Sequence, residues 1–510
     1  MNKLKKLFYD FLPFFLGGLA SLSFAPTYFL FLLFLAFPAL LLLISKTSSL
    51  KESFYVGWLF GFGFFLFGLY WISYALLVDE DLFGWLVPFA VTLIPAILAL
   101  YTGVLTTLLH KFRKNTYMLT IGFIALWVLF EIIRTTLFTG FPWLALGYSL
   151  SNYLSIIQSA SLFGVFGLSL LLLLIVTTPF ILLLEYKNNR LSALVYVFCC
   201  FLIFILNFSY GNWILKHAER EFLPYSVRVV QPNIPQSIKW DKYYRYLNLQ
   251  KTMSLSKSDS QEVQTYIIWP EATVLYSMND KSTRDLIKTI IPENSFLITG
   301  GIRDEKNPTK YWTSLFMLNH DGDIVDHYDK MHLVPFGEYI PFRDILPFSI
   351  KKITHGFLDY TSGTHAKIIQ PPHGMPSFRG LICYESFFSQ ELLVADQRPD
   401  FLLNITNDAW YGDSPGPYQH FDITKFRAIE YGIPMIRSAN TGISAVISPY
   451  GEILQQLPLK KEGFILSELP KQKKNKTLYN LYGNTSLIII LIVAFTGTYM
   501  LFSNKKFVNV

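Results

Sequence analysis

Charged residues are scarce in this chain. They make up 15% of its 510 residues, whereas an ordinary soluble protein carries about 25%. Hydrophobic residues make up 52%, and phenylalanine alone occurs 46 times, which excludes intrinsic disorder because disordered chains have low hydrophobicity. Three cysteines are too few for the disulfide framework of a small secreted domain. The composition therefore indicates a membrane protein, or a soluble domain with a large membrane part attached.

Familiar phosphate-binding and metal-binding motifs are also missing. The sequence has no GxxxxGK[ST] loop and no HExxH pair, and its nine histidines follow no recurring ligand spacing. The net charge of +7 is modest for a chain of this length. We therefore expect no cofactor, no bound metal and no nucleic-acid partner.

Eight apolar runs are close to the length of about 20 residues that crosses a bilayer as a helix. The runs are 7–24, 28–44, 53–77, 83–109, 117–138, 161–184, 193–210 and 486–502. The first run also fits a secretory signal peptide, but six further runs follow at once, so we expect a retained helix. The sequence thus predicts seven transmembrane helices in 1–211, a globular domain in 212–480, and a last transmembrane helix with a short cytoplasmic tail in 481–510.

Lysine and arginine cluster in alternate short loops between these runs. The clusters are Lys3, Lys5 and Lys6; Lys46 and Lys51; Lys111, Arg113 and Lys114; Lys187 and Arg190; and Lys505 and Lys506. The opposite short loops lack basic residues. The positive-inside rule places the clusters in the cytoplasm, so the domain at 212–480 is expected outside the membrane.

Two ionisable residues, Glu131 and Arg134, fall inside a predicted span. They are three residues apart, so they share a helix face and can pair. Intramembrane charges are functional candidates, but a buried ion pair or a span end placed one turn too deep explains them equally well. Their role stays open at this point.

The region 212–480 has the pattern of an α/β domain. Strand-like segments such as YIIWPE, GLICYES and FLLNITND alternate with helix-like ones such as KSTRDLIKTI and FDITKFRAIEYG. Polar side chains follow the strands where they end: Glu271, Cys383, Asn407 and Asp408. Loops at the carboxyl ends of strands usually hold the ligands of open α/β sheets.

Cysteine placement separates one candidate nucleophile from two packing residues. Cys199 and Cys200 lie among apolar residues of the seventh run, where a thiol is inert. Cys383 follows a strand and is flanked by Tyr384 and Glu385. It is the one cysteine placed to act as a nucleophile, although a buried packing role is common for a lone cysteine.

Three pieces of sequence in order resemble the nitrilase superfamily. They are Trp269-Pro270-Glu271, Asp329-Lys330 and Cys383 in GLICYES, matching the Glu–Lys–Cys signature of that superfamily. The segments QPNIPQSIKWD, FGEY, NITNDAWYG, RSANTGIS and TGFPWLALGYS, together with the eight apolar runs, resemble its membrane-embedded branch, the apolipoprotein N-acyltransferases. The resemblance implies an α-helical membrane bundle carrying an αββα sandwich, in the cell inner membrane with the catalytic domain on the periplasmic side.

The resemblance also implies a chemistry. Glu271 would be the general base, Cys383 the nucleophile, and Lys330 a fixed positive charge that favours the thiolate and stabilises the developing oxyanion, with the backbone N–H of Tyr384 as second donor. A phospholipid would donate an acyl chain to form a thioester, and the N-terminal amine of a diacylglyceryl-modified lipoprotein cysteine would accept it. A monomer suffices for this ping-pong reaction.

Other matching residues receive smaller roles. By resemblance, Glu338 is a second carboxylate near the thiol that orients Lys330 or relays protons; a loop salt bridge is the alternative. Glu385 would either hold the turn around Cys383 or take part in the chemistry. Three aromatic residues on loops, which either close over lipid or anchor in the interface, are Trp240, Trp410 and Tyr411.

Two rival functions remain open on the sequence. A membrane-tethered amidase or nitrile hydrolase with the same triad would release its thioester to water. A transporter or receptor would bind a ligand through the outer domain without turnover. The hydrolase would require Cys383 for its activity, whereas the transporter or receptor would not.

Overall fold

The computed structural model describes residues 3–257, 265–343, 351–354, 358–392 and 397–503. The chain forms two compact units. A helical unit comprises Met1–Ser73, Trp85–His217 and Thr477–Val510, and an α/β unit comprises Tyr74–Gly84 and Ala218–Lys476. The α/β unit thus includes the short segment Tyr74–Gly84 from within the apolar part of the sequence. The predicted domain boundaries stay a prediction.

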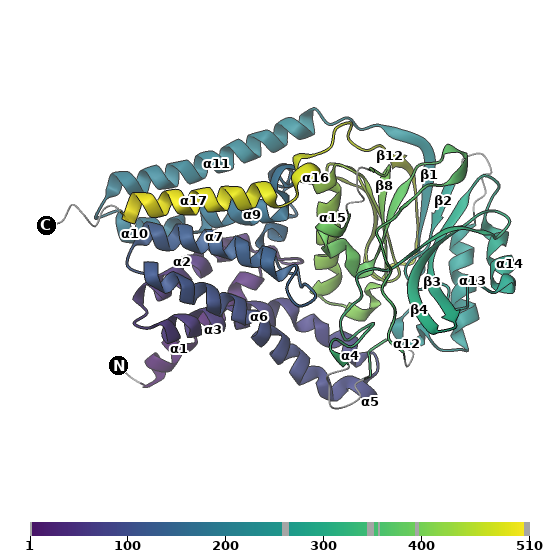
Figure 1. Cartoon of the computed structure of the whole chain (residues 1–510), viewed down its shortest axis with the longest axis horizontal. Helices are drawn as coiled ribbons and strands as arrows, with labels where there is room; N and C mark the ends of the chain where they lie inside the picture. Colours follow the sequence, from purple (N-terminus) through teal and green to yellow (C-terminus); the bar gives the residue numbers. More distant parts are fainter. Residues whose placement is uncertain (1–2, 258–264, 344–350, 355–357, 393–396, 504–510) are drawn as a thin grey trace. The chain divides into compact units, whose positions relative to one another are not determined.

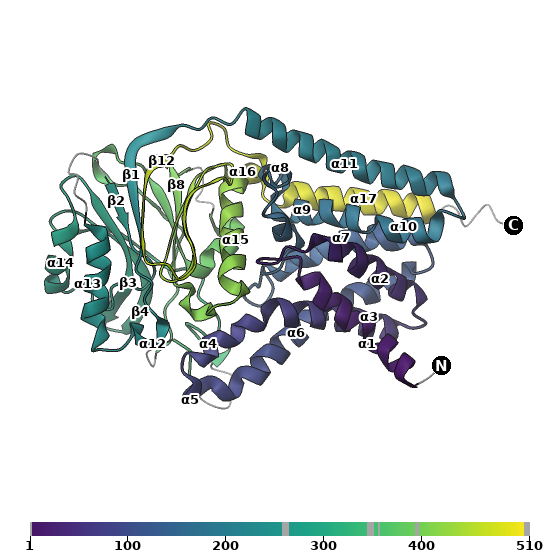
Figure 2. The same cartoon turned by 180° about the vertical axis from the view of Figure 1, so that it is seen from behind.

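Each predicted apolar run contains a helix of the helical unit, and most of the long ones run roughly parallel or antiparallel to one another (Figure 2). They are α1 (Lys3–Ser21), α2 (Leu33–Lys46), α3 (Leu50–Leu69), α6 (Val87–Leu109), α7 (Thr116–Arg134), α9 (Ala160–Val176) continued by α10 (Thr178–Glu185), α11 (Arg190–Lys216) and α17 (Thr485–Ser503). Short connecting helices are η1 (Leu30–Leu32), η2 (Tyr70–Ile72), η3 (Gly84–Leu86), η4 (His110–Phe112), η5 (Leu146–Leu150), α8 (Leu154–Ile157) and α16 (Leu478–Tyr482).

Within the described residues, five helical segments are long and apolar enough to cross a membrane, namely Leu50–Leu77, Glu80–Phe112, Thr116–Arg134, Ala160–Glu185 and Arg190–Lys216. The apolar helices Asp10–Ser21, Leu30–Lys46 and Thr485–Thr498 are shorter. A membrane-embedded helical region is therefore confirmed, while the count of eight spans stays a prediction.

Small residues allow α3 to pack closely between two neighbours. A Cβ atom on Gly63 would lie 2.0 Å from the carbonyl oxygen of Phe14 on α1, and one on Gly61 would lie 1.9 Å from Thr102 Oγ1 on α6. Both distances are far below van der Waals contact. Helix pairs in lipid use small residues in this way, because their association depends on close packing rather than on the hydrophobic effect.

Glu131 and Arg134 both bind the loop that follows α7. Glu131 Oε1 accepts hydrogen bonds from Leu146 N at 2.8 Å and from Trp127 Nε1 at 3.0 Å, and Arg134 Nη1 donates to the carbonyl oxygen of Trp143. Backbone groups without a helical partner must be satisfied inside an apolar region. The two side chains thus hold the TGFPWLALGYS segment, which runs into the short helix η5, a use that the expected pairing between them did not anticipate.

The α/β unit contains two six-stranded sheets that pack face to face (Figure 1). The first has the order β12-β1-β2-β3-β4-β5 and the second β11-β10-β9-β8-β7-β6. The strands are β1 (Phe222–Gln231), β2 (Thr265–Ile268), β3 (Phe296–Lys306), β4 (Thr309–Leu318), β5 (Ile324–Asp329), β6 (Ile368–Ile369), β7 (Phe378–Ile382), β8 (Phe401–Thr406), β9 (Met435–Ala439), β10 (Ser444–Ile447), β11 (Ile453–Leu457) and β12 (Gly463–Pro470).

Helices cover the outer faces of the two sheets. The longer ones are α13 (Tyr244–Ser256) and α14 (Lys281–Ile287) on the first sheet, and α15 (Pro415–Tyr431) on the second. Short elements are α4 (Ser73–Leu77), α5 (Glu80–Phe83), α12 (Gln236–Lys239), η6 (Lys288–Ile290), η8 (Pro372–Gly374), η9 (Cys383–Phe387), η10 (Ser389–Leu392) and η11 (Asp408–Tyr411). The predicted αββα sandwich is confirmed.

The core between the sheets is apolar and explains the burial of the strands. Val227, Ile268 and Leu315 of the first sheet meet Phe378 and Leu403 of the second. Side chains of a strand alternate between faces, and the opposite face of the first sheet packs on α13 and α14. Strands buried on both faces read as continuous apolar runs such as FLLNIT, in agreement with the sequence pattern.

The two sheets share one pattern of strand directions. In β1-β2-β3-β4-β5 and in β7-β8-β9-β10-β11 the successive pairings are parallel, parallel, antiparallel and antiparallel. Strands β2, β3 and β5 therefore run in one direction and end at one edge of the first sheet. Polar residues that follow β2 and β5 are brought to this edge by the topology alone.

Candidate functional site

Three predicted residues follow the ends of three strands. Glu271 comes three residues after β2, Lys330 directly after β5, and Cys383 directly after β7. Lys330 Nζ lies 3.3 Å from Glu271 Oε1, and the Cys383 thiol interacts electrostatically with both charged groups. All three side chains are buried. The structure thus gathers Glu271, Lys330 and Cys383 from two different sheets.

Gly300 on β3 makes room for the turn that carries Glu271. A Cβ atom at this position would lie 2.7 Å from the Cα atom of Glu271. The carbonyl oxygen of Gly300 accepts hydrogen bonds from Thr273 N at 3.0 Å and Val274 N at 3.1 Å, which fixes the chain just after Glu271. The backbone of β3 therefore positions the carboxylate directly.

Lys330 is held between two carboxylates. Its Nζ lies 3.0 Å from Glu338 Oε1 and 3.3 Å from Glu271 Oε1, and the side chain is 1% exposed. Glu338 is fixed in turn by Thr313 Oγ1 at 3.2 Å and Val334 N at 2.8 Å. Burial opposes the charged ammonium, but the two carboxylates outweigh it and raise the pKa of Lys330 well above its usual value. Lys330 is a permanent cation, and Glu338 orients it.

Burial raises the pKa of both the thiol and the carboxylate. Burial, together with the charge of Glu271, raises the pKa of Cys383, and Lys330 only partly opposes this. Burial also raises the pKa of Glu271 despite the nearby ammonium of Lys330. Cys383 is therefore a protonated thiol at neutral pH, and the positive charge of Lys330 does not by itself create a thiolate. A base must remove the proton as the thiol attacks.

Cys383 has a left-handed backbone conformation, with φ of +52°. Such a conformation is rare for a residue other than glycine, and it places strain on the backbone where other contacts hold it. The carbonyl oxygen of Cys383 accepts hydrogen bonds from Ser386 Oγ at 3.2 Å and Asn404 Nδ2 at 3.4 Å. These contacts hold the sharp turn from β7 into η9 that presents the thiol.

Glu385 ties this turn to the segment that carries Lys330. Its carboxylate accepts hydrogen bonds from Ile382 N at 2.7 Å, Met331 N at 2.7 Å and the hydroxyl of Tyr328 at 2.6 Å. The residue before Cys383 and the residue after Lys330 therefore both donate a backbone hydrogen bond to the buried carboxylate of Glu385. Tyr384 is also buried, and its ring packs on His332 and Phe388. Its backbone N–H as an oxyanion donor stays a prediction.

Comparison with known proteins identifies the family. One family model, the apolipoprotein N-acyltransferase N-terminal domain, matches residues 16–178, and another, carbon-nitrogen hydrolase, matches residues 226–476. The apolipoprotein N-acyltransferase of Rickettsia bellii is 38% identical over 498 residues, which cover 97% of this chain and 97% of the relative. The chain belongs to the apolipoprotein N-acyltransferase family.

More distant relatives carry the same name. The apolipoprotein N-acyltransferase of Rhodopseudomonas palustris is 35% identical, covering 89% of this chain and 88% of the relative. This chain is therefore an acyltransferase that modifies lipoproteins and has a membrane-embedded helical region. A solved amidase from Nesterenkonia sp. aligns with a TM-score of 0.36 and 16% identity, covering 49% of this chain and 92% of the amidase.

The aromatic residues predicted to contact lipid lie on or next to two short elements. Trp240 follows α12, while Trp410 and Tyr411 lie in η11, and all three are partly buried. Burial, with the nearby Cys383 thiol and Asp408, raises the pKa of Tyr411 well above its usual value. Tyr411 is thus near the nucleophile. Contact of these residues with lipid stays a prediction.

Two residues that the sequence did not assign to the site contact Glu271. The backbone N–H of Asn407, after β8, donates to Glu271 Oε2 at 3.0 Å. Lys239 Nζ, at the end of α12, donates to the carbonyl oxygen of Glu271 at 3.1 Å. Asn407 could be suspected from its place at a strand end. No sequence signal distinguished Lys239 from a surface lysine in the KWD segment.

A second buried polar cluster lies beneath the Cys383 turn. Asp408 accepts from Arg437 Nη2 at 2.7 Å and from His420 Nδ1 at 2.8 Å, and His420 Nε2 lies 3.1 Å from Ser386 Oγ. Burial opposes the carboxylate of Asp408, but Arg437 and His420 lower its pKa to about 2. Burial and Arg437 lower the pKa of His420 to about 4, so it is neutral at pH 7. The cluster resembles a Ser–His–Asp arrangement, but full burial denies it a substrate.

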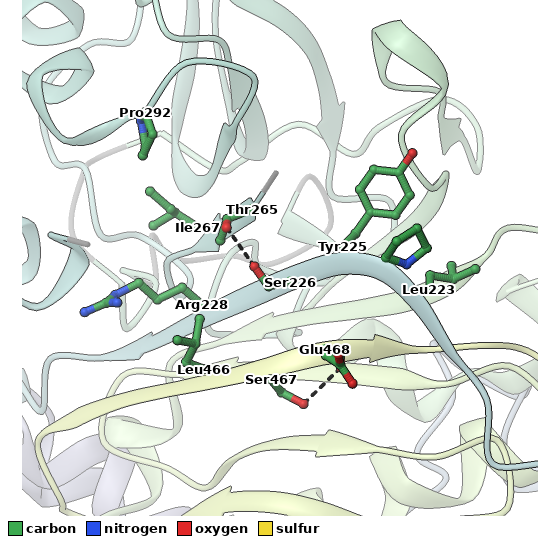
Figure 3. Close-up of a pocket in the computed structure, with 11 residues that line it drawn as sticks. Leu223, Tyr225, Ser226, Arg228, Thr265, Ile267, Pro292, Leu466, Ser467 and Glu468 are labelled. Atoms are coloured by element: carbon green, nitrogen blue, oxygen red, sulfur yellow. Dashed lines mark hydrogen bonds between the residues drawn. The ribbon is translucent and has the colours of Figure 1, made fainter. Parts of the chain in front are cut away.

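A surface groove elsewhere in the α/β unit is separate from this site (Figure 3). It lies against β1, β2 and β12, and the side chains that line it include Tyr225, Ser226, Arg228, Thr265 and Glu468. Ser226 Oγ and Thr265 Oγ1 are joined by a 2.7 Å hydrogen bond in its floor. None of the residues that line the groove belongs to the cluster around Lys330, so it carries no part of the chemistry below.

Proposed function

We propose that this chain moves a fatty acyl chain from a membrane phospholipid to the N-terminal amine of a diacylglyceryl-modified lipoprotein cysteine, through a thioester on Cys383. The observation that carries the proposal is the convergence of Glu271, Lys330 and Cys383 at strand ends of two packed sheets. A nucleophile beside a base and a fixed cation is the arrangement that acyl transfer requires.

The first half-reaction forms the thioester. Cys383 Sγ attacks the ester carbonyl carbon while its proton passes to Glu271, which matters because the thiol is protonated at neutral pH. The negative charge that develops on the carbonyl oxygen is stabilised by Lys330. When the tetrahedral intermediate collapses, the C–O bond breaks and the lysophospholipid alcohol leaves with the proton from Glu271. The acyl chain then remains on sulfur.

The second half-reaction transfers the acyl chain to an amine. The lipoprotein amine attacks the thioester carbon, its proton passes to Glu271, and Lys330 again stabilises the oxyanion. The C–S bond breaks, and the leaving sulfur takes the proton back from Glu271. The products are an amide and the original thiol. A thioester reacts readily with amines, which favours transfer over hydrolysis when water is kept out.

The membrane location of the substrates is supported by the segment Tyr74–Gly84. This segment belongs to the α/β unit, and the peptide chain continues from it into the apolar helices Leu50–Leu77 and Glu80–Phe112. A Cβ atom on Gly412, next to Tyr411, would lie 2.4 Å from the ring of Tyr74. Moving an acyl chain into water costs about 0.8 kcal/mol per CH₂, so a unit whose chain continues directly into membrane-spanning helices suits a lipid donor. We place this unit on the periplasmic face of the inner membrane.

Mass spectrometry of the purified protein tests the proposal. After incubation with phospholipid alone, we expect a fatty-acyl mass on the peptide that contains Cys383, removable by hydroxylamine. Addition of a diacylated lipopeptide should discharge this mass and yield N-acylated peptide. Free fatty acid without N-acylated peptide would instead indicate a hydrolase. Acyl transfer by Cys383→Ala would rule out the thioester, and a ligand-binding role without turnover predicts no adduct.

A further inference from the structure

Lys239 is a buried cation beside the base of the proposed reaction. Its side chain is 3% exposed, and its Nζ donates a 3.1 Å hydrogen bond to the carbonyl oxygen of Glu271. It also interacts electrostatically with Glu271 and Cys383. An ammonium group has three N–H donors, and this bond uses one of them. Burial of an ammonium is unfavourable unless charge partners compensate for it, and Glu271 is such a partner.

Lys239 is a second cation on the Glu271 side of the site. Two carboxylates, Glu271 and Glu338, contact one ammonium, Lys330. Lys352 interacts with Glu338, whereas Lys239 interacts with Glu271. Without Lys239, Glu271 would have only its share of the Lys330 charge. Like-charged carboxylates in such a site raise the pKa of one of them, which then binds a proton.

We infer that Lys239 is a positioning residue that acts through its charge, keeping Glu271 ionised so that Glu271 can accept the proton of Cys383. This inference rests on the role proposed for Glu271. A protonated Glu271 cannot serve as a base, and the ammonium of Lys330 is already shared with Glu338. The hydrogen bond to the Glu271 carbonyl oxygen fixes the lysine side chain at the point where its charge is needed.

The remaining ionisable groups around Glu271 do not replace this charge. Tyr360 and Tyr411 interact with Glu271 electrostatically, but burial raises the pKa of both, so they are neutral. Lys352 interacts with Glu338 instead, and Asp408 is paired with Arg437. Burial lowers the pKa of Lys239 to about 8 against the pull of Glu271. Lys239 therefore carries its charge in the neutral range where Glu271 needs it.

Lys239→Gln tests the charge separately from the hydrogen bond, because the amide keeps a donor for the Glu271 carbonyl oxygen but is neutral. The rate of thioester formation on Cys383 is measured between pH 6 and 9.5 with a phospholipid that carries a fluorescent acyl chain. We expect the acidic limb of the profile to move up by one pH unit or more. On the acidic limb the rate at a given pH then falls about tenfold and returns towards the unmodified rate by pH 9.

Two further variants complete the test. Lys239→Met should displace the acidic limb as far as Lys239→Gln does. Lys239→Arg keeps the charge and should displace the limb by no more than half as far. Lys473→Met serves as the matched control, because Lys473 is a largely buried lysine that stacks on Tyr450 elsewhere in the α/β unit. We expect this control to keep the acidic limb of the unmodified enzyme.

The inference is overturned if Lys239→Gln keeps the unmodified acidic limb, or if it changes only the concentration of phospholipid needed for half-saturation. Cys383→Ala, assayed in parallel, separates this result from a failure of the proposed function. If Cys383→Ala is inactive while the Lys239 profile does not move, only the role of Lys239 is wrong. If Cys383→Ala still transfers acyl chains, the proposed function itself is wrong.

Discussion

Lys330 lies slightly nearer to Glu338 than to Glu271: its Nζ is 3.0 Å from Glu338 Oε1 and 3.3 Å from Glu271 Oε1. The cation is therefore shared, and neither carboxylate receives its full charge. A base that is fully paired with a cation is a weak base, because the pair stabilises its ionised form. Sharing Lys330 with Glu338 leaves Glu271 basic enough to accept a proton from a thiol.

Glu338→Gln should slow thioester formation without preventing folding. Lys330 would then pair with Glu271 alone, which lowers the pKa of Glu271 and its strength as a base. We expect the rate of Cys383 acylation to fall, by up to about tenfold for each unit by which the pKa of Glu271 is lowered. Glu391→Gln is the matched control, since Glu391 accepts from His332 at 2.9 Å and is partly exposed. Equal acylation rates in the two variants would show that Glu338 does not tune the base.

Tyr328→Phe should disturb the site less than Glu385→Gln. The phenylalanine removes one of the donors to Glu385, and a bond to a charged group contributes about 1.5–3 kcal/mol. The glutamine turns its NH₂ group towards a backbone N–H, either Ile382 N or Met331 N, so a donor faces a donor. Thermal unfolding and the acylation rate measure the two effects. We expect the larger loss of both from Glu385→Gln, and the reverse order would contradict the positioning role of Glu385.

Strand ends were the part of the site that the sequence could predict. Glu271 and Cys383 follow apolar runs that are buried on both faces. Such runs can be recognised in the sequence without knowledge of the fold. Two strands that the sequence did not predict contain polar residues: β9 contains the buried Arg437, and β5 (IVDHYD) lies at a sheet edge with several partly exposed side chains. Whether these two segments form strands depends on the neighbouring strands that pair with them in the folded sheet.

The partners of buried charges were the part that the sequence could not predict. Lys239 lies in a four-residue helix, where no periodicity shows which side chains face inwards. Glu131 and Arg134 were recognised as intramembrane charges, but their backbone partners Leu146 and Trp143 lie beyond the helix. The spacing of three residues suggested a pair, whereas the loop geometry gives each charge its own carbonyl or N–H partner.

Acid should destabilise the α/β unit through His420. Its pKa is about 4 in the folded chain, against an ordinary value of 6.5, so between these values the unfolded chain binds a proton that the folded chain does not. Stability from this group is therefore complete above pH 6.5 and is lost as the pH falls towards 4. The difference corresponds to about 3 kcal/mol. Asp408, with a pKa of about 2, adds a further loss only below its ordinary value of 3.8.

Thermal unfolding in detergent between pH 4.5 and 7.5 measures this effect of His420. His420→Gln should be less stable at pH 7 but should lose less of its stability on acidification than the unmodified protein. His365→Gln, at an exposed position, should keep the full pH dependence. A His420→Gln protein with the unmodified pH dependence would show that the acid sensitivity arises from another group.

Glu131→Leu should release the loop that follows α7, whereas Glu131→Gln should retain it. The amide oxygen of glutamine can still accept from Leu146 N and Trp127 Nε1, which Glu131 Oε1 binds at 2.8 Å and 3.0 Å. Leucine leaves both buried donors unpaired, at a cost of about 1–3 kcal/mol each. We expect a lower unfolding temperature and faster proteolysis of the loop in Glu131→Leu alone. If both variants were equally impaired, the charge of Glu131 rather than its hydrogen bonds would be what the helical unit requires.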